Sequence, residues 1–323
     1  MKGAFLQRIM LGAVLVVAVI VLNFLLLQAA PGDVVDSMLA EGGGGDPKLA
    51  AQLRESYGLD QPIYIQLFKY LGRVLSGDLG FSFYYDETVA ELIVNALPTT
   101  LMLTLSALVV AVVMGTLFGI YSAMNPRGLF SHFVTVFSLF GYATPVFWLG
   151  MIILLVFALH LPWFPAFGIR SIPEPDGLLN RTLDILQHLV LPVFTLAILY
   201  LASYSRISRA SMLDVLGADY IRTARTKGMS EFVVIFKHAL KNAALPVVTL
   251  AGLQLGQIFS GAVLVETVFS LPGVGPLLYE SIVRRDYPVI LGVLFGAATT
   301  TIVANIITDL LYKKMDPRIQ SIT

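Results

Sequence analysis

Residues 97–123 read LPTTLMLTLSALVVAVVMGTLFGIYSA, and this stretch contains no charged side chain. A helix needs about 20 apolar residues to cross the hydrocarbon core of a bilayer, which is about 30 Å thick. Charged side chains at that depth are costly. A long uncharged run is therefore typical of a membrane-spanning helix, and this one predicts a helix surrounded by lipid.

The composition of the whole chain agrees with a membrane environment. Over 323 residues, 57% are hydrophobic and 13% are charged, and the mean hydropathy is +0.81. A soluble domain is far less apolar, so a secreted enzyme is disfavoured. Cysteine is absent from the sequence, which excludes disulfides, thiolate catalysis and cysteine zinc sites.

Five further segments on either side of the central run are apolar and long enough to cross a bilayer. The first of them follows Lys2 and Arg8 but is too long for the apolar region of a signal peptide, so we interpret it as a retained anchor. We therefore expect an all-α membrane protein with a single transmembrane domain over residues 1–323. Its six expected spans are residues 9–28, 98–122, 133–159, 189–206, 246–268 and 288–312.

The distribution of charge predicts the orientation of these spans. With a cytoplasmic N-terminus, 13 of the 21 Lys and Arg residues fall on the cytoplasmic side, against 4 of the 21 Asp and Glu residues. This excess of basic residues follows the positive-inside rule, so we expect both termini in the cytoplasm. Residues 30–97 then form a long extracytoplasmic loop, and residues 207–245 form a cytoplasmic loop.

The cytoplasmic loop contains the basic stretch RTARTKGMSEFVVIFKHALKNAALP at 222–246. Apolar residues at helical spacing predict a helix from Leu213 to Thr226, and Gly228 follows where a left-handed residue ends a helix. Ser230 can then cap a second helix, with Glu231 in its first turn. The residues expected on the apolar stripe of this second helix are Phe232, Phe236, Ala239 and Ala243.

Two interpretations of this helical hairpin remain open from the residues alone. In the first, its basic side chains hold it against anionic lipid headgroups. In the second, its turn docks into a groove of a cytoplasmic partner and passes a rigid-body motion to the neighbouring spans.

The hairpin sequence also resembles a known family. DYIRTARTKG at 219–228, followed by HALKNAALP at 238–246, is similar to the EAA loop of permease subunits from binding-protein-dependent ABC importers, in the dipeptide, oligopeptide and nickel branch. The general loop begins Glu-Ala-Ala, where this chain has Arg222, Thr223 and Ala224, and it retains the glycine at Gly228. Five further similar stretches cover 57–82, 97–123, 141–157, 161–168 and 265–290, so the resemblance extends over nearly the whole chain.

The resemblance implies a type I (MetI-like) permease fold in the bacterial cytoplasmic (inner) membrane. It implies that the chain forms half of a pore with a homologous second permease subunit. Two cytoplasmic ATPase subunits would bind ATP and Mg and drive transport, and an extracytoplasmic binding protein would deliver short peptides. Members similar to this family also carry nickel, glutathione, haem or oligosaccharides. The residues implied to couple the pore to the ATPases, without chemistry, are Tyr220, Ala224, Lys227, Gly228, Met229 and Ser230.

The sequence itself offers little other chemistry. It contains no G-x-x-x-x-G-K-[ST] phosphate loop, and EGGGGDPK at 41–48 fails that spacing, so we interpret it as a loop. The four histidines are scattered singly, without metal-ligand spacing. We therefore expect no catalytic residue, metal or cofactor on this chain and no nucleic-acid partner.

A rival function uses the acidic residue Asp309 within the last expected span. An ionisable group inside a span is a candidate proton or ion site, as in a stand-alone secondary transporter. Asp309 also lies one turn from Lys313, so a paired carboxylate near the interface is the alternative. Asn23 and Asn305 can bond across helices. An intramembrane enzyme is a more distant possibility, because the sequence shows no nucleophile elbow or metal set.

Two extracytoplasmic segments allow more than one interpretation. IYIQLFKYLGRVL at 63–75 is amphipathic, with Tyr64, Ile65, Phe68, Leu71 and Leu75 available for one face. It is either an interfacial helix or, with residues 159–188 and 269–287, a platform for the binding protein. TVFSLPGVGPLLYESI at 267–282 is either a re-entrant turn near the pore mouth or an ordinary loop with a short helix.

Overall fold

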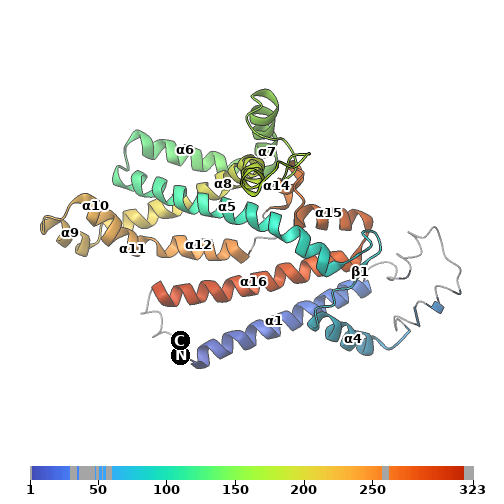
Figure 1. The fold of residues 1–323 in the computed structure, drawn as a ribbon. Helices are drawn as coiled ribbons and strands as arrows, with labels where there is room; N and C mark the ends of the chain where they lie inside the picture. The colour runs from blue at the N-terminus through green and yellow to red at the C-terminus, as the bar shows by residue number, and fades with distance from the viewer. Residues whose placement is uncertain are drawn as a thin grey trace. The chain divides into compact units, whose positions relative to one another are not determined.

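The computed structural model describes residues 2–29, 35, 48, 51–52, 54–55, 60–256 and 262–315, with the side chains of the first and last helices described from residue 10 and up to residue 308. The described chain is almost entirely helical (Figure 1) and divides into two compact units. One unit comprises Met1–Pro98 and Gly273–Ile306, and the other comprises Thr99–Pro272 and Ile307–Thr323. The tetraglycine segment, residues 257–261 and the side chain of Asp309 lie outside the described residues.

Four described helices are each long and apolar enough to cross a membrane. They are α1 (Lys2–Ala29), α5 (Val89–Met124), α8 (Leu178–Leu216) and α16 (Tyr287–Met315). Two bent pairs of helices pass the same test if each pair is counted as one span, which gives up to six. The expected all-α membrane fold is therefore confirmed.

The first bent pair falls in the third expected span. Helix α6 (Leu129–Ala143) is followed by α7 (Val146–Leu154) and the π-helical turn η1 (Leu155–His160), with a bend of 104° between the two parts. Pro145 has no N–H to donate, and it pushes the preceding Thr144 into an extended conformation, with φ −84° and ψ 126°. The segment expected at 133–159 is consequently not one straight helix.

The second bent pair leads into the fifth expected span. The helical residues 231–243 and α12 (Leu245–Gly256) meet at 48°, next to Pro246. The helix α14 (Val263–Val268) follows the undescribed residues. Residues 267–282, for which the sequence allowed two interpretations, comprise the end of α14, a non-helical connection and most of the short helix α15 (Val274–Arg284).

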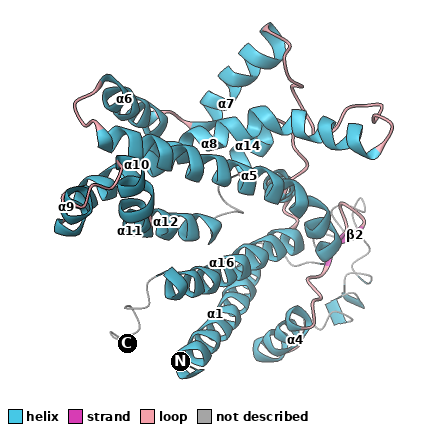
Figure 2. Cartoon of the chain, turned by 60° about the vertical axis from the view of Figure 1, so that its left-hand side comes forward, coloured by secondary structure: helices cyan, strands magenta, loops and turns pink. Residues whose placement is uncertain are grey.

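In the first unit, α1 and α16 lie side by side and run antiparallel (Figures 1 and 2). A Cβ atom placed on Gly12 would lie 3.2 Å from Ile302, so the two helices approach closely there. The side chain of Asn23 is buried and donates its amide N–H to the carbonyl of Leu291 at 3.1 Å. The expected cross-helix bond of Asn23 is therefore confirmed, whereas Asn305 is exposed.

The amphipathic helix α4 (Ile63–Leu75) packs on the end of α1. Tyr70 contacts Phe24, with ring centroids 5.9 Å apart, and Gln28 donates to Gln66 at 2.9 Å. Part of the apolar face named from the sequence is exposed, since Phe68 is 73% exposed, while Val74 on another side of the helix is buried. Packing against α1 selects the face of Tyr70 and Val74, which are one helical turn apart.

A short hairpin of β1 (Phe81–Ser82) and β2 (Glu87–Thr88) packs against α15 in the same unit. Tyr85 donates its hydroxyl to Glu280 at 3.0 Å, and the guanidinium of Arg284 lies 3.9 Å from the ring centroid of Tyr84. Burial, followed by the hydrogen bond to Glu280, raises the pKa of the Tyr85 hydroxyl to about 12. These contacts attach residues 81–88, near the end of the long loop of 30–97, to α15.

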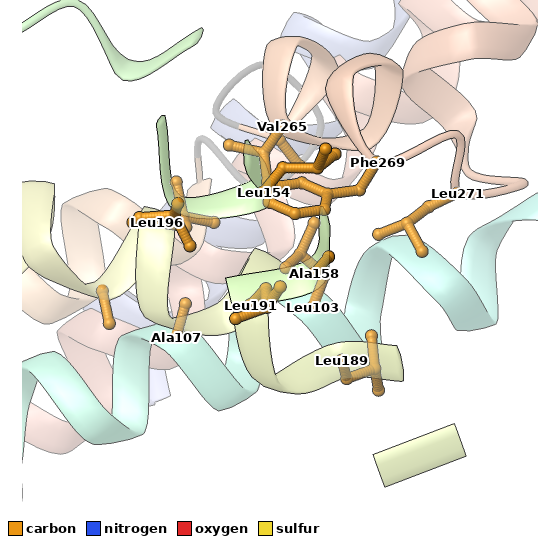
Figure 3. Packing of buried hydrophobic residues seen from close by; sticks show 13 residues of the cluster. Leu103, Ala107, Leu154, Ala158, Leu189, Leu191, Leu196, Val265, Phe269 and Leu271 are labelled. Atoms are coloured by element: carbon orange, nitrogen blue, oxygen red, sulfur yellow. The ribbon is translucent and has the colours of Figure 1, made fainter. Parts of the chain in front are cut away.

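The core of the second unit gathers side chains from α5, α7, α8 and α14. Figure 3 shows Leu154, Leu196, Val265 and Phe269 meeting above Leu103 of α5. All five side chains are buried. Because lipid is as apolar as these side chains, tight packing rather than exclusion from water holds such helices together.

Helices α5 and α8 approach each other most closely at two glycines of α5. A Cβ atom on Gly115 would lie 2.6 Å from the Cβ atom of Tyr204, and one on Gly119 would lie 2.5 Å from that of Ser208. Ser208 also donates its hydroxyl to the carbonyl of Thr116 at 3.2 Å. This is a G-x-x-x-G contact, in which small residues let two backbones meet.

We expect the substitution Gly119→Ala to destabilise the second unit by about 1–3 kcal/mol, because the added methyl group has no space and the backbones must separate. Thermal unfolding of the purified protein in detergent would measure this as a lowered Tm. The matched control is Gly72→Ala in α4, where a Cβ atom would meet nothing within 4 Å. An unchanged Tm in Gly119→Ala would contradict the close contact.

Candidate functional site

The candidate site is the helical hairpin that follows α8. Helix α8 ends at Leu216, and α9 (Asp219–Thr226) begins after a break at Gly217 and Ala218 (Figure 1). The single helix expected from Leu213 to Thr226 is therefore wrong. Glycine weakens a helix at Gly217, and the carboxylate of Asp219 favours a new helix N-terminus there.

The turn after α9 has the expected left-handed glycine. Gly228 has a φ of +77°, its N–H donates to the carbonyl of Arg225 at 3.0 Å, and the N–H of Met229 donates to the carbonyl of Ala224 at 3.4 Å. These two bonds form a Schellman motif, which confirms the predicted helix end. A Cβ atom on Gly228 would meet nothing within 4 Å, so the backbone conformation, and not lack of space, requires glycine here.

The second arm of the hairpin begins directly after Ser230. It consists of α10 (Glu231–Val233), the π-helical turn η2 (Val234–Ala239) and α11 (Leu240–Ala243). Ser230 occupies the N-cap position, but its side chain makes no capping hydrogen bond. The predicted position of the cap is therefore correct, but the predicted capping by the side chain of Ser230 is wrong.

An ion pair joins the two arms across the turn instead. Arg225 donates to both carboxylate oxygens of Glu231, at 2.8 and 3.3 Å. Both side chains are exposed, so the pair contributes at most about 1 kcal/mol. Further from the turn, Asn242 donates its amide N–H to the hydroxyl of Tyr220 at 2.8 Å. These contacts hold the arms at a defined separation.

The inner face of the hairpin packs on the ends of two membrane helices. The buried residues Ile221 and Val234 belong to one cluster with Ile120 of α5 and Met212 of α8. The other buried members are Ala123, Ala224, Ile235, Ala239 and Ala243. The hairpin therefore shares one close-packed cluster with the ends of α5 and α8.

The apolar stripe of the second arm differs in part from its prediction. Ala239 and Ala243 are buried as expected, but Phe232 is 70% exposed and Val234 and Ile235 are buried in its place. The π-helical turn η2 explains the difference, since its bonds span five residues and rotate the preceding side chains away from an α-helical register.

The structure separates the predicted coupling residues into two groups. Lys227, Gly228, Met229 and Ser230 are exposed at the turn, and Tyr220 is exposed on α9. Ala224 is buried in the cluster, so it holds the hairpin together and offers no contact surface.

The exposed part of the turn is larger than the sequence indicated. We define the turn surface as residues 227–230 together with Phe232. Phe232 was missed as a surface residue because it fits a helical stripe, and only the π-helical turn reveals its exposure. The ion pair of Arg225 and Glu231 was also missed, although opposite charges on either side of a predicted turn could have indicated it.

The described residues bring together no catalytic constellation at this hairpin. Within the described part of the chain, no group of three or more His, Cys, Asp or Glu side chains could hold a metal ion. The site instead offers an exposed turn whose inner face is packed on the ends of α5 and α8.

We expect the substitution Ala224→Leu to loosen the hairpin, because the larger side chain must enter a cluster that is already filled. Limited trypsin digestion after Lys227 should then be several-fold faster than in the unchanged protein. The matched control is Thr223→Leu, at an exposed neighbouring position of α9. Trypsin should cleave this variant at the same rate as the unchanged protein. Equal rates in both variants would show that the cluster does not hold the turn.

Comparisons with known proteins give the chain relatives over its full length. Residues 115–321 match the family described as binding-protein-dependent transport system inner membrane component, and residues 2–104 match the N-terminal region of the same kind of component. An oligopeptide transport system permease protein of Bacillus subtilis is 39% identical over 325 residues, covering 99% of this chain and 100% of the relative. A di/tripeptide transport system permease protein of Pseudomonas aeruginosa is 40% identical, covering 94% of each chain. A dipeptide transport system permease protein of Escherichia coli is 38% identical with the same coverage.

Proposed function

Because the chain belongs to the family of inner membrane components of binding-protein-dependent transport systems, we propose that it forms half of the translocation pore of an ATP-driven importer of short peptides. The peptide cargo is supported by relatives whose names state oligopeptide, di/tripeptide and dipeptide transport. Nickel, glutathione, haem or oligosaccharide is the alternative cargo within the family.

The proposed assembly contains several other polypeptides. A homologous second permease subunit completes the pore, an extracytoplasmic binding protein delivers the peptide, and two cytoplasmic ATPase subunits bind ATP and Mg. The dependence on a binding protein is part of the family description. Separate ATPase subunits are supported by the sequence, which contains no G-x-x-x-x-G-K-[ST] phosphate loop.

The observation that carries the coupling role is the shared core of the hairpin. The turn surface is exposed, while the inner face of the hairpin lies in one buried cluster with α5 and α8. An ATPase that grips the turn would therefore move these two helices as it closes. In this proposal Tyr220, Lys227, Met229 and Ser230 contact the ATPase, Gly228 shapes the turn and Ala224 anchors it.

The proposed orientation places both chain termini and the hairpin in the cytoplasm. It is supported by the excess of Lys and Arg on that side of the six spans. The loop of residues 30–97 then faces the binding protein, and residues 207–245 face the ATPases.

We expect Gly228→Arg to abolish peptide uptake while the protein still inserts into the membrane, because a bulky charged side chain at the turn obstructs docking. Uptake of a labelled dipeptide into cells and co-purification of the ATPase subunits would measure the two effects. Two controls separate docking from backbone strain. Gly228→Asn keeps a residue that tolerates the left-handed conformation and should retain most uptake. Gly177→Arg makes the same change at a glycine with φ +85° and open surroundings, outside the hairpin. Because residue 177 lies in a segment that one interpretation assigns to binding-protein contact, co-purification of the ATPase subunits is the readout for this control, and it should be unchanged. Full uptake in Gly228→Arg would remove the case for coupling through this turn.

The rival function, a stand-alone transporter that uses Asp309, makes a different prediction. For Asp309→Asn we expect at most a modest loss of uptake, because the energy comes from the ATPases. Uptake in cells, compared at equal amounts of assembled protein, checks this. Complete loss of uptake with normal assembly would favour the rival.

A further inference from the structure

Helices α6 and α8 enclose a pocket of about 220 Å³ in the second unit. The two helices touch beside it, where the hydroxyls of Ser138 and Ser205 are 2.9 Å apart and a Cβ atom on Gly141 would lie 3.1 Å from Ala202. The residues that line the pocket are Val134, Thr135, Ser138, Leu139, Tyr142, Ala202, Ser203, Ser205, Arg206 and Arg209. Neither the hairpin nor its turn contributes to this lining.

The charge of the pocket is entirely positive. Arg206 and Arg209 lie three residues apart on α8, and hence on neighbouring positions of one helix face, and no Asp or Glu is among the lining residues. No ion pair involves either arginine within the described part of the chain. The lining surface of the pocket is mostly apolar, and its only charged side chains are these two cations, which favours an anion that also carries an apolar part.

Arg209 also carries an unpaired buried donor next to the pocket. Its Nε atom is buried and has no hydrogen-bond partner among the described residues. A buried donor without an acceptor is unfavourable, and more so when it carries charge. The guanidinium of Arg206 lies 5.7 Å from the ring centroid of Tyr142, which holds it at the edge of the pocket.

The remaining lining identifies the kind of anion. Leu139 is 65% exposed and Tyr142 is 71% exposed, and both stand at the rim on α6. The span expected from the sequence at residues 189–206 ends at Arg206, and a span end would place this side chain near the lipid headgroups. An anion that carries apolar chains would place its charge on the arginines and its chains along the rim, whereas a small soluble anion would leave the apolar rim unused.

We propose that this pocket binds the phosphate group of an anionic phospholipid between Arg206 and Arg209, with an acyl chain against Leu139 and Tyr142. Arginine suits this role because its planar fork of donors matches phosphate oxygens, and basic pockets between membrane helices bind such headgroups. The proposal concerns a lipid site and does not depend on the cargo or on the ATPase contact.

Native mass spectrometry of the full-length protein tests the proposal. The detergent-solubilised chain is offered phosphatidylglycerol or phosphatidylcholine with identical acyl chains, and the bound lipids are counted. We expect at least about tenfold preference for phosphatidylglycerol, because the choline cation of phosphatidylcholine would lie beside the two guanidinium groups and repel them, whereas the glycerol headgroup carries no cation. The double variant Arg206→Gln, Arg209→Gln should lose this preference. The matched control, Lys237→Gln with Lys241→Gln, removes two exposed cations of the hairpin and should keep it.

A charge-conserving variant, a competition with inorganic phosphate and a measurement on the assembled complex complete the test. The double variant Arg206→Lys, Arg209→Lys keeps the charge and should retain a weaker preference, which guards against misfolding in the glutamine variant. Inorganic phosphate should fail to compete at equal concentration; full competition would assign the pocket to a soluble phosphate and overturn the lipid. A preference that survives in the glutamine variant, or one that is absent from the unchanged protein, would also overturn the proposal. Loss of the preference in the assembled complex would also overturn the proposal, because an acidic side chain of a partner subunit would then pair with the arginines in place of the lipid.

Discussion

Close contact between the backbones of α5 and α8 is the constraint on which the second unit depends. Gly115 and Gly119 leave no space for a side chain against Tyr204 and Ser208. In a bilayer the lipid is as apolar as the side chains, so van der Waals contact at short distance must supply the attraction. Because the two helices meet in this way, their ends lie side by side and form the surface on which the hairpin packs.

The proposed coupling makes two demands on the hairpin. Its turn must be exposed so that a partner can bind it, and its inner face must be packed firmly on the ends of α5 and α8. The Schellman motif at Gly228 and the ion pair of Arg225 with Glu231 fix the turn locally, while Ile221 and Val234 join the cluster formed with α5 and α8. In the proposed coupling, docking would use the exposed face of this segment and transmission the buried face, so a change on one face can leave the other intact.

The lipid pocket and the hairpin both belong to the end of α8. Arg206 and Arg209 lie only two to three turns before the break at Gly217. A bound phospholipid would neutralise the guanidinium of Arg209 and join α6 to α8 at that end, below the bend at Pro145. A bound lipid would thus help to stabilise the end of α8, which in the proposed function receives movement from the hairpin.

The sequence by itself determined the membrane fold, the positions of most apolar helices and the left-handed turn at Gly228. These features follow from local rules, because a bilayer demands long uncharged helices and a glycine allows positive φ. Only the tertiary structure decided the bend at Pro145, the break at Gly217 and the exposure of Phe232, since proline and glycine permit a bend without fixing its angle and a π-helical turn shifts side chains out of register. It also decided that Arg206 and Arg209 face a pocket on α6, because such a pairing depends on which helices pack together.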